Sequence, residues 1–416
     1  MITIGKPYIE RRGEETFLLS LLQDEVRKKD LEVWFSVSNE YGGYLCEDYA
    51  DSFLLMTLLL GMNSGQDIQV LAPVSERLLH NLENTVQPLL AKANPKFRQI
   101  KITALPARNP QYGGTAVGCC CSLGVDSFAS FLKNTEEQTP ESYRVTHLTL
   151  FNSGQLGYLD LKGAEQLFHK SIEDLQPFAA EVGLPIVAVN TNLNEWYLDG
   201  GISIIQSMTF RTISCAMALQ KLFGKYIFAS SYSAERFQMS QEDCTHMESV
   251  FVPQLSTENM EVVLSQPVMN RVEKTAYISR YPITYRYLDV CWSGQMAYGV
   301  AQYSNYYDEK EKTNCGRCDK CLRTMLTLDF VGQLDKYEGQ FDMDYYRTHK
   351  EWYIAKVLVN KKGNQFYDEL SVLLTQKGYV PSRRVRKIMF KLKYPISIEK
   401  IRRKVRKTIK KLSRKV

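Results

Sequence analysis

Between residues 115 and 230 the chain alternates short apolar runs with longer helical patterns, and this alternation constrains the fold most. The runs TAVGCC, HLTLF, PIVAVN and YIFASS have the length and composition of buried strands, and helical segments separate them. The last of these helices is expected to end at Gly224. Strands separated by helices predict a parallel sheet with helices on both faces, which is an α/β fold.

A smaller alternation of the same kind precedes this region. The predicted strands are LEVWFSV, DIQVLAPV and FRQIKITALPA, and the predicted helices begin at Asp51, as a cap, and just after Ser75. Residues 108–114 contain one proline and two glycines, which are typical of a connection between domains. We therefore interpret residues 1–112 as an N-terminal α/β unit of its own.

The remaining boundaries follow from composition and pattern, since 416 residues allow two or three domains. We expect a main domain over residues 113–330, with a cysteine-rich region at 291–321 inside it. The pattern between 232 and 290 is weak and suggests loops. A helical region over 331–381 and a basic tail over 382–416 complete the predicted organisation.

No apolar run approaches the length of a membrane span, and the N-terminus does not have the layout of a signal peptide. A cytosolic location is therefore expected. Thiols stay reduced in that compartment, so the ten cysteines are expected to be metal ligands or core residues rather than disulfides.

Three polar stretches, SLGVDS, NSGQ and SSYS, fall at the carboxyl ends of predicted parallel strands, where such sheets bind ligands. The stretch at 122–127 is expected to offer backbone N–H groups at a helix N-terminus, hydroxyls from Ser122 and Ser127, and close approach at Gly124. Asp126 would cap the helix, contact Mg²⁺ or orient neighbouring amides. An ordinary capped turn is the alternative.

The stretch SLGVDS resembles the pyrophosphate-binding loop of the ATP pyrophosphatase (PP-loop) superfamily, SGGxDS, with Leu123 where glycine is usual. FNSGQLG at 151–157 resembles the second-strand motif FDYGQRH of 7-cyano-7-deazaguanine synthases. FRTISCAMAL carries Arg211 where that family has an arginine, with threonine in place of its asparagine, and RVEKT carries Lys274 where it has a lysine. The resemblance covers roughly residues 115–325.

This resemblance implies a HUP-type, Rossmann-like domain that binds ATP with Mg²⁺ and adenylates a carboxylate or amide-type oxygen, releasing pyrophosphate. Ammonia or another nucleophile would then attack the product. A deazapurine would fit these motifs as the small-molecule substrate, whereas a sugar acid or glycan precursor at a membrane would fit the basic tail. Asp126, Lys274 and Arg211 are the implied catalytic residues. The implied nucleotide contacts are Ser122, Leu123, Gly124, Val125, Asp126, Ser127, Asn152, Ser153 and Gln155.

The sequence NCGRCDKC contains Cys315, Cys318 and Cys321 with two residues between each and the next, and Cys291 is the natural fourth ligand. Four thiolates select tetrahedral Zn²⁺, although iron–sulfur proteins share this spacing. The deazaguanine synthases also place one cysteine ahead of such a triple and hold structural zinc. One zinc per chain is therefore expected.

Cys119, Cys120 and Cys121 read as buried strand residues, since successive side chains point to opposite faces of a strand and the three cannot converge on one metal. Cys46 and Cys215 are expected in the core. Three further residues of the loop region are candidates for contacting the acceptor substrate or ammonia: Glu235, Asp243 and His246.

The tail at 382–416 carries 16 Lys and Arg and one acid, which leaves a charge of −9 on residues 1–381. Ile398, Ile401, Val405, Ile409, Leu412 and Val416 form one apolar stripe at helical spacing. A peripheral contact with the anionic inner face of a membrane is favoured; contact with nucleic acid and docking onto the acidic body are the alternatives.

Two further functions stay open beside the adenylating enzyme. One is a tRNA-modifying PP-loop enzyme, in which the tail would hold RNA and Cys121 or Cys244 would supply a reactive thiol. The other is a zinc-binding module without catalysis, which Leu123 would explain.

Overall fold

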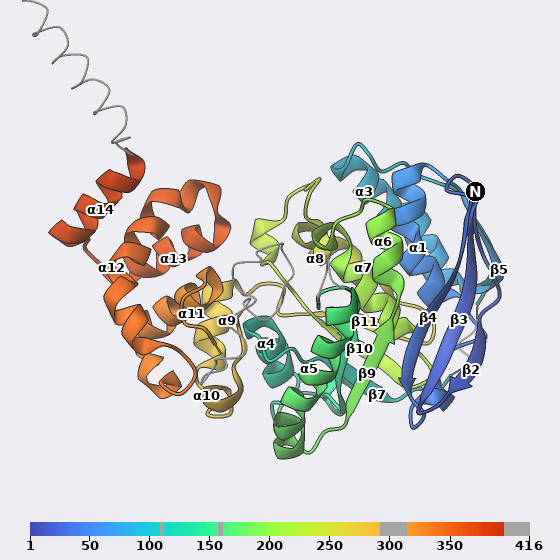
Figure 1. Ribbon diagram of the computed structural model, residues 1–416, viewed down its shortest axis with the longest axis horizontal. Helices are drawn as coiled ribbons and strands as arrows, with labels where there is room; N and C mark the ends of the chain where they lie inside the picture. Colours follow the sequence, from blue (N-terminus) through green and yellow to red (C-terminus); the bar gives the residue numbers. More distant parts are fainter. Residues whose placement is uncertain (109–111, 157–160, 292–313, 395–416) are drawn as a thin grey trace, which may run out of the picture. The chain divides into compact units, whose positions relative to one another are not determined.

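The computed structural model describes residues 1–108, 112–156, 161–291 and 314–394. The chain divides into two compact units, residues 1–313 and 314–416. The first unit is a mixed α/β structure with one large sheet and helices around it, drawn in Figure 1. The α/β class expected from the alternation of apolar runs is confirmed.

Five neighbouring strands of the eleven-stranded sheet run parallel to one another. In chain order they are arranged 3-2-1-4-5, the order of a doubly wound sheet, and the order reverses between β7 and β10. All four strands expected in this region are present, and β11 adds a fifth that the weak pattern after residue 232 had hidden. The five are β7 (Ala116–Cys120), β8 (His147–Asn152), β9 (Ile186–Thr191), β10 (Phe223–Ala229) and β11 (Glu261–Ser265).

The N-terminal residues extend the same sheet, so residues 1–112 do not form a sheet of their own. Phe35 and Ser36 of β4 pair antiparallel with β9, and one buried apolar cluster includes both Phe35 and Phe210. The sheet is therefore mixed rather than wholly parallel, because β3 pairs antiparallel with both β4 and β1. The N-terminal strands are β1 (Ile2–Ile4), β2 (Tyr8–Arg12), β3 (Glu15–Asp24), β4 (Lys29–Ser38), β5 (Ile68–Ser75) and β6 (Ile102–Ala107).

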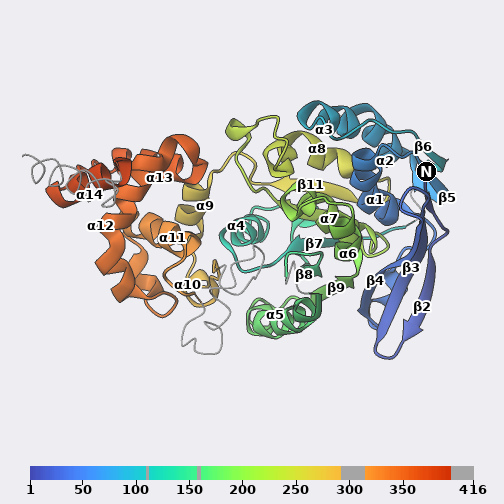
Figure 2. The same ribbon diagram turned by 45° about the horizontal axis from the view of Figure 1, so that its top comes forward.

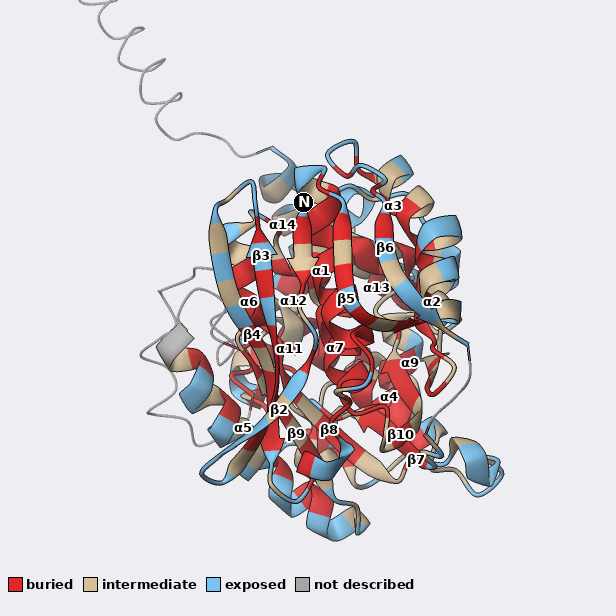
Figure 3. Cartoon of the chain, turned by 90° about the vertical axis from the view of Figure 1, so that its right-hand side faces the viewer, coloured by how far each residue is buried: buried red, intermediate tan, exposed pale blue. Residues whose placement is uncertain are grey.

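Helices cover both faces of the parallel strands. Figure 2 shows α5 on one side of β8 and β9, and α6 and α7 on the other. Burial follows this layering in Figure 3, where the inner strands, α1 and α7 are buried and β2 is exposed. These helices are α1 (Asp51–Ser64), α2 (Glu76–Asn81), α3 (Gln87–Ala93), α4 (Val125–Lys133), α5 (Leu161–Val182), α6 (Leu193–Asp199) and α7 (Ile204–Met217).

Two local expectations are corrected. Helix α7 ends at Met217 rather than at Gly224, because a series of turns leads from it into β10. Asp51 is not a cap: Ala50 is the N-cap of α1, and buried Asp51 accepts hydrogen bonds from the Ser75 N–H at 2.8 Å and the Gln220 side chain at 3.0 Å. Ser75 does cap α2, as expected.

The region after β10 is less regular but contains more than loops. It holds α8 (Glu248–Phe251), β11, α9 (Arg271–Ile278) and α10 (Thr284–Tyr287). Within it, α9 packs on α4 and so brings the RVEKT segment to the candidate loop. The strand β11 closes one edge of the sheet beside β10.

The second unit is helical where it is described. Its helices are α11 (Asp319–Phe330), α12 (Met343–Asn360), α13 (Gln365–Gln376) and α14 (Arg383–Lys393). The apolar stripe predicted from Ile398 to Val416 lies outside the described residues. No helix in the described ranges has both the length and the apolar character needed to cross a bilayer.

Candidate functional site

The turn between β7 and α4 has an unusual backbone at Leu123. Its φ of 55° lies in the left-handed region, which residues other than glycine adopt at a cost of about 1 kcal/mol or more. The Leu123 carbonyl accepts a hydrogen bond of 2.9 Å from the backbone N–H of Asp289. Glycine adopts this backbone conformation without that cost, so leucine here is held by its surroundings.

Gly124 is the N-cap of α4, and the buried side chain of Val125 fixes the first residue of the helix in the core. Ser122 Oγ donates a hydrogen bond of 3.2 Å to Ser127 Oγ, and Ser127 Oγ donates one of 3.1 Å to the Gly124 carbonyl. The turn therefore gathers two hydroxyls beside the first N–H groups of a helix, an arrangement that favours an anion.

Asp126, in the first turn of α4, is the centre of a charged group. Arg271 lies 2.5 Å from one of its carboxylate oxygens and Lys274 lies 3.4 Å from the other. Both cations come from α9, three residues apart and hence on one face of that helix. Two cations beside one carboxylate leave a net positive charge next to the loop, so the aspartate does not make the site repel anions.

Lys274 is almost fully buried, at 1% exposure. Burial lowers its pKa, and the neighbouring carboxylate of Asp126 opposes that shift. Its ammonium also donates hydrogen bonds to the Ser230 carbonyl at 2.5 Å and the Ser230 hydroxyl at 2.9 Å. Lys274 thereby connects the end of β10 to the turn after β7, across the point where the strand order reverses.

The second polar stretch follows β8 and is tied to neighbouring elements. Asn152 donates a hydrogen bond of 2.8 Å to Asn190 of β9. Ser153 donates one of 2.7 Å to Gln155, and Gln155 reaches Thr212 of α7 at 3.3 Å. The three residues implied as nucleotide contacts lie together at the carboxyl end of β8, as the sequence predicts.

Arg211 lies beneath this second stretch and is fully buried. Its guanidinium donates hydrogen bonds to Asn194 at 2.7 Å, Ser207 at 2.8 Å and the Ser153 carbonyl at 3.3 Å, and it stacks over Tyr197 at 4.1 Å. The predicted catalytic residues thus fall into two places, because Lys274 contacts Asp126 whereas Arg211 supports the segment after β8.

The buried carboxylate of Glu248 accepts hydrogen bonds that hold the segment after β10 in place. It accepts hydrogen bonds from the Ser231 N–H at 3.0 Å and from Thr209 at 2.7 Å. Burial raises its pKa to about 7, against the lowering effects of those hydrogen bonds and of Lys274. Sequence reasoning missed this residue, since no pattern distinguishes it from an exposed glutamate.

The candidate substrate residues lie in the same region. Tyr232 and His246 stack with ring centroids 4.1 Å apart, and Tyr232 donates a hydrogen bond of 3.3 Å to Asp243. Asp243 also accepts hydrogen bonds from the N–H and hydroxyl of Thr245. Glu235 is exposed in the short turn at 234–236. Only Asp243 and His246 of the three candidates belong to one hydrogen-bonded and stacked group.

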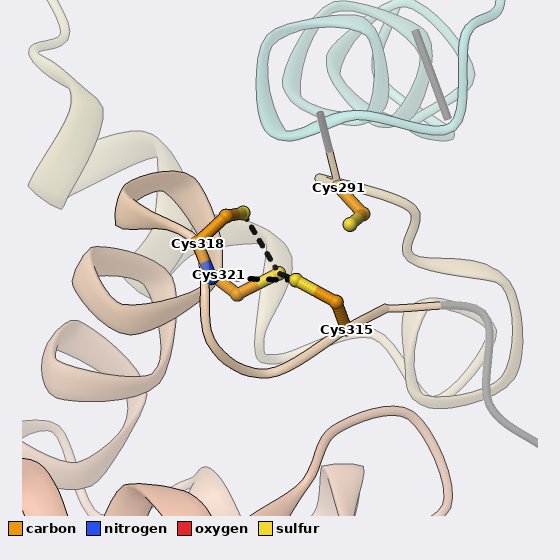
Figure 4. Close-up of side chains that lie close together, drawn as sticks. All are labelled: Cys291, Cys315, Cys318 and Cys321. Atoms are coloured by element: carbon orange, nitrogen blue, oxygen red, sulfur yellow. Dashed lines mark hydrogen bonds between the residues drawn. The ribbon is translucent and has the colours of Figure 1, made fainter. Parts of the chain in front are cut away.

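The four predicted metal ligands come together, as Figure 4 shows. The sulfur atoms of Cys291, Cys315, Cys318 and Cys321 all lie within 4.8 Å of one another. The separations of Cys321 Sγ from Cys318 Sγ and Cys315 Sγ are 3.4 and 3.8 Å. Sulfurs on a tetrahedral zinc with bonds of 2.3 Å are roughly 3.8 Å apart, so this cluster fits such an ion.

The backbone around Cys315 is arranged for a thiolate. The N–H groups of Arg317 and Cys318 point to its sulfur at 3.4 and 3.3 Å, and hydrogen bonds of this kind stabilise negative sulfur. Gly316 has a φ of 68°, and a Cβ there would lie 2.6 Å from the backbone nitrogen of Asp342. Glycine is therefore required for the tight turn of this ligand loop.

The remaining cysteines are buried or nearly so, as expected. Cys46, Cys119, Cys121, Cys215 and Cys244 are buried, and Cys120 is intermediate. Burial raises the pKa of both Cys121 and Cys244 well above the ordinary value. Because the thiolate is the reactive form, these two thiols are poorly placed for nucleophilic chemistry.

Two residues of the site were missed in the sequence although a signal was present. Arg271 heads the RVEKT segment that identifies Lys274, and helical spacing places it on the same face. Asp289 precedes the first cysteine ligand by two residues and contacts Leu123. Comparison with family models, curated proteins and solved structures gives no match for this chain, so the assignment of the site rests on geometry and chemistry.

Proposed function

We propose that the chain is an ATP-dependent adenylating enzyme of the PP-loop type, built on a HUP-type sheet. The observation that carries this proposal is the position of the SLGVDS turn. It lies at the reversal of strand order, beside a helix N-terminus and two cations that converge on Asp126. Doubly wound sheets bind nucleotides at such a reversal.

In the proposed reaction an oxygen of the acceptor attacks the α-phosphorus of ATP, a new P–O bond forms, and the bond to pyrophosphate breaks. Ammonia or another nucleophile then displaces AMP from the acceptor. The N–H groups at the start of α4, with Ser122 and Ser127, would hold the departing pyrophosphate. Lys274 and Arg271 would offset its charge, and Mg²⁺, when bound, would supply further positive charge there.

Asp126 has two possible roles in this reaction, and both depend on its carboxylate. It pairs with both Lys274 and Arg271. On nucleotide binding it would either keep them there or contact Mg²⁺, which prefers carboxylate and phosphate oxygens. The segment from Asn152 to Gln155 would contact the adenosine part, since it follows the neighbouring strand.

The resemblance suggests a deazapurine as the acceptor, and the basic tail suggests a sugar acid or glycan precursor. A deazapurine carboxylate is the first acceptor to test and a sugar acid the second. The RNA-modifying alternative is less well supported, because the thiols it would use, Cys121 and Cys244, are buried. The cluster of four cysteines would have a structural role, as closed four-cysteine zinc sites do.

The test is pyrophosphate release by the full chain with Mg-ATP and each acceptor, together with mass spectrometry of a cell extract incubated with the protein. We expect an adenylylated metabolite and its product, both abolished by Asp126→Ala. Asp174→Ala, which removes an exposed carboxylate on α5, is the matched control and should leave both signals intact. Absence of Mg-ATP binding to the folded, metal-loaded protein would overturn the proposal.

A further inference from the structure

The segment that leads to the first cysteine ligand also holds the candidate nucleotide loop. The backbone N–H of Asp289 donates the 2.9 Å hydrogen bond to the carbonyl of Leu123. The side chain of Asp289 accepts a hydrogen bond of 3.0 Å from the backbone N–H of Cys291. One residue therefore contacts the loop through its backbone and the metal ligand through its carboxylate.

The contact falls at the one point of the loop where the backbone is strained. Leu123 has the positive φ of 55°, and such a conformation persists when the surrounding structure fixes it. The carbonyl bonded to Asp289 belongs to this same residue. The other side of the turn is fixed by the core, through the buried side chains of Cys121 and Val125.

A metal held by the four cysteines would in turn set the position of Cys291. Its sulfur lies within 4.8 Å of the other three, and an ion bound to all four would restrict it to one place. A carboxylate that accepts a hydrogen bond from the backbone N–H of a metal ligand is held in place when that ligand is fixed. The side chain of Asp289 is such a carboxylate for Cys291.

We infer that Asp289 is a positioning residue that couples metal binding at Cys291 to the conformation of the loop at 121–124. The inference deepens the proposed function, on which its nucleotide part rests. With the metal bound, Asp289 keeps Leu123 in its left-handed conformation and the N–H groups of α4 directed at the anion. Without the metal, the segment at 288–291 loosens and the loop loses that support.

The first test needs no nucleotide. Hydrogen exchange of peptides covering 121–133 is measured in the full chain as purified, after EDTA treatment, and after Zn²⁺ is restored. We expect faster exchange in the loop when the metal leaves and recovery when it returns, while β3 and β4 stay protected. Unchanged loop exchange in protein shown to have lost its metal would overturn the inference.

Variants of Asp289 separate positioning from general destabilisation. Asp289→Asn keeps an oxygen acceptor for the Cys291 N–H and should behave as wild type. Asp289→Ala should keep its metal, yet its loop should exchange hydrogen as fast as the loop of EDTA-treated wild type. We expect the alanine variant to lose Mg-ATP affinity and the asparagine variant to keep it, because only the alanine variant lacks an acceptor for the Cys291 N–H. Equal behaviour of the two variants would contradict the inference, and if the alanine variant does not fold, EDTA treatment of wild type decides.

A matched control is Asp67→Ala, which removes a similar hydrogen bond away from the loop, donated by the backbone N–H of Lys101 to the Asp67 carboxylate. It should change neither loop exchange nor nucleotide binding. The two proposals can fail separately. If loop hydrogen exchange depends on the metal but the protein does not bind Mg-ATP, the coupling stands and the proposed enzyme function is wrong. If Mg-ATP affinity is the same with and without the metal, the coupling alone is wrong.

Discussion

The ammonium group of Lys274 lies 3.4 Å from the carboxylate of Asp126, and both groups meet at the reversal of strand order in the sheet. The lysine also donates two hydrogen bonds to Ser230, at the end of β10. A buried cation is retained only where it is paired and hydrogen-bonded, because burial without partners is costly. This cation therefore has a fixed position, which suits it to stabilise negative charge at a single place.

Replacing Lys274 by methionine should abolish pyrophosphate release while preserving the fold. Methionine keeps much of the side-chain volume, and Asp126 remains paired with Arg271. Loss of one fixed charge that stabilises a transition state lowers turnover by about 10²-fold or more. The measurement is pyrophosphate release under saturating Mg-ATP, with circular dichroism as a check on folding.

Lys133→Met is the control for this variant, since Lys133 is a half-exposed lysine on α4 paired with Glu136. Its turnover should match wild type. Wild-type turnover in the Lys274 variant would instead show that the buried lysine is only a structural partner of Asp126 and Ser230.

The segment after β8 should not tolerate a side chain at Gly154. Its φ is 104°, and a Cβ there would lie 2.3 Å from the guanidinium of Arg211. Arg211 is fully buried and cannot move aside freely. We expect Gly154→Ala to lower stability by about 3 kcal/mol, as backbone strain combined with overpacking does, measured by urea unfolding.

Gly183 allows strain and clash to be separated. It also has a positive φ, 67°, but a Cβ there would meet nothing within 4 Å. Gly183→Ala should therefore lower stability by only about 1 kcal/mol. Equal losses at the two glycines would mean that Arg211 does not restrict the segment after β8.

The sequence anticipated the parallel half of the sheet because each buried strand there is a continuous apolar run bounded by turn residues. It did not reveal how the N-terminal strands join that half. The junction consists of the pairing of Phe35 and Ser36 with β9, between segments about 150 residues apart. Pairing between distant strands leaves no pattern in the local sequence. The two halves of one sheet were therefore predicted as two separate units.

In the candidate site, too, short sequence motifs could be predicted, whereas contacts between distant residues could not. The turn at 122–127 and the cysteine spacing could be identified directly, since each is a short motif. Glu248 could not, because no pattern distinguishes it from an exposed glutamate. The position of Asp289 beside Cys291 is visible in the sequence, but its contact with Leu123 joins residues far apart in the chain. The motif also gave Arg211 the same role as Lys274, whereas their side chains lie at different strand ends.

Stability should fall as pH rises from about 4 to about 7, because two buried acids are held in their neutral form. Burial raises the pKa of Asp51 to about 6 and that of Glu248 to about 7, from ordinary values of 3.8 and 4.5. A raised pKa in the folded state contributes stability at low pH that is lost as pH passes through the folded value. The loss is on the order of 3 kcal/mol for each acid, measured by urea unfolding from pH 4 to pH 8.

The double variant Asp51→Asn with Glu248→Gln should flatten this dependence, since amides do not titrate in that range. Glu83→Gln, at an exposed position, should leave it unchanged. Stability that rises with pH over the same interval in wild type would contradict the assignment of neutral carboxyls at these two positions.

The cysteine cluster should hold one Zn²⁺ per chain and lose it when Cys321 is replaced. Metal analysis is expected to give one equivalent of zinc without visible absorbance, whereas iron with a visible band would establish an iron–sulfur centre instead.

Cys321→Ala removes the sulfur that contacts both Cys315 and Cys318, so the variant should retain less than about a tenth of the metal and unfold around 314–330. Cys120→Ala is the matched control, because Cys120 is a strand residue outside the cluster, and it should keep the full equivalent. Full zinc retention in the Cys321 variant would mean that the metal is held elsewhere in the chain.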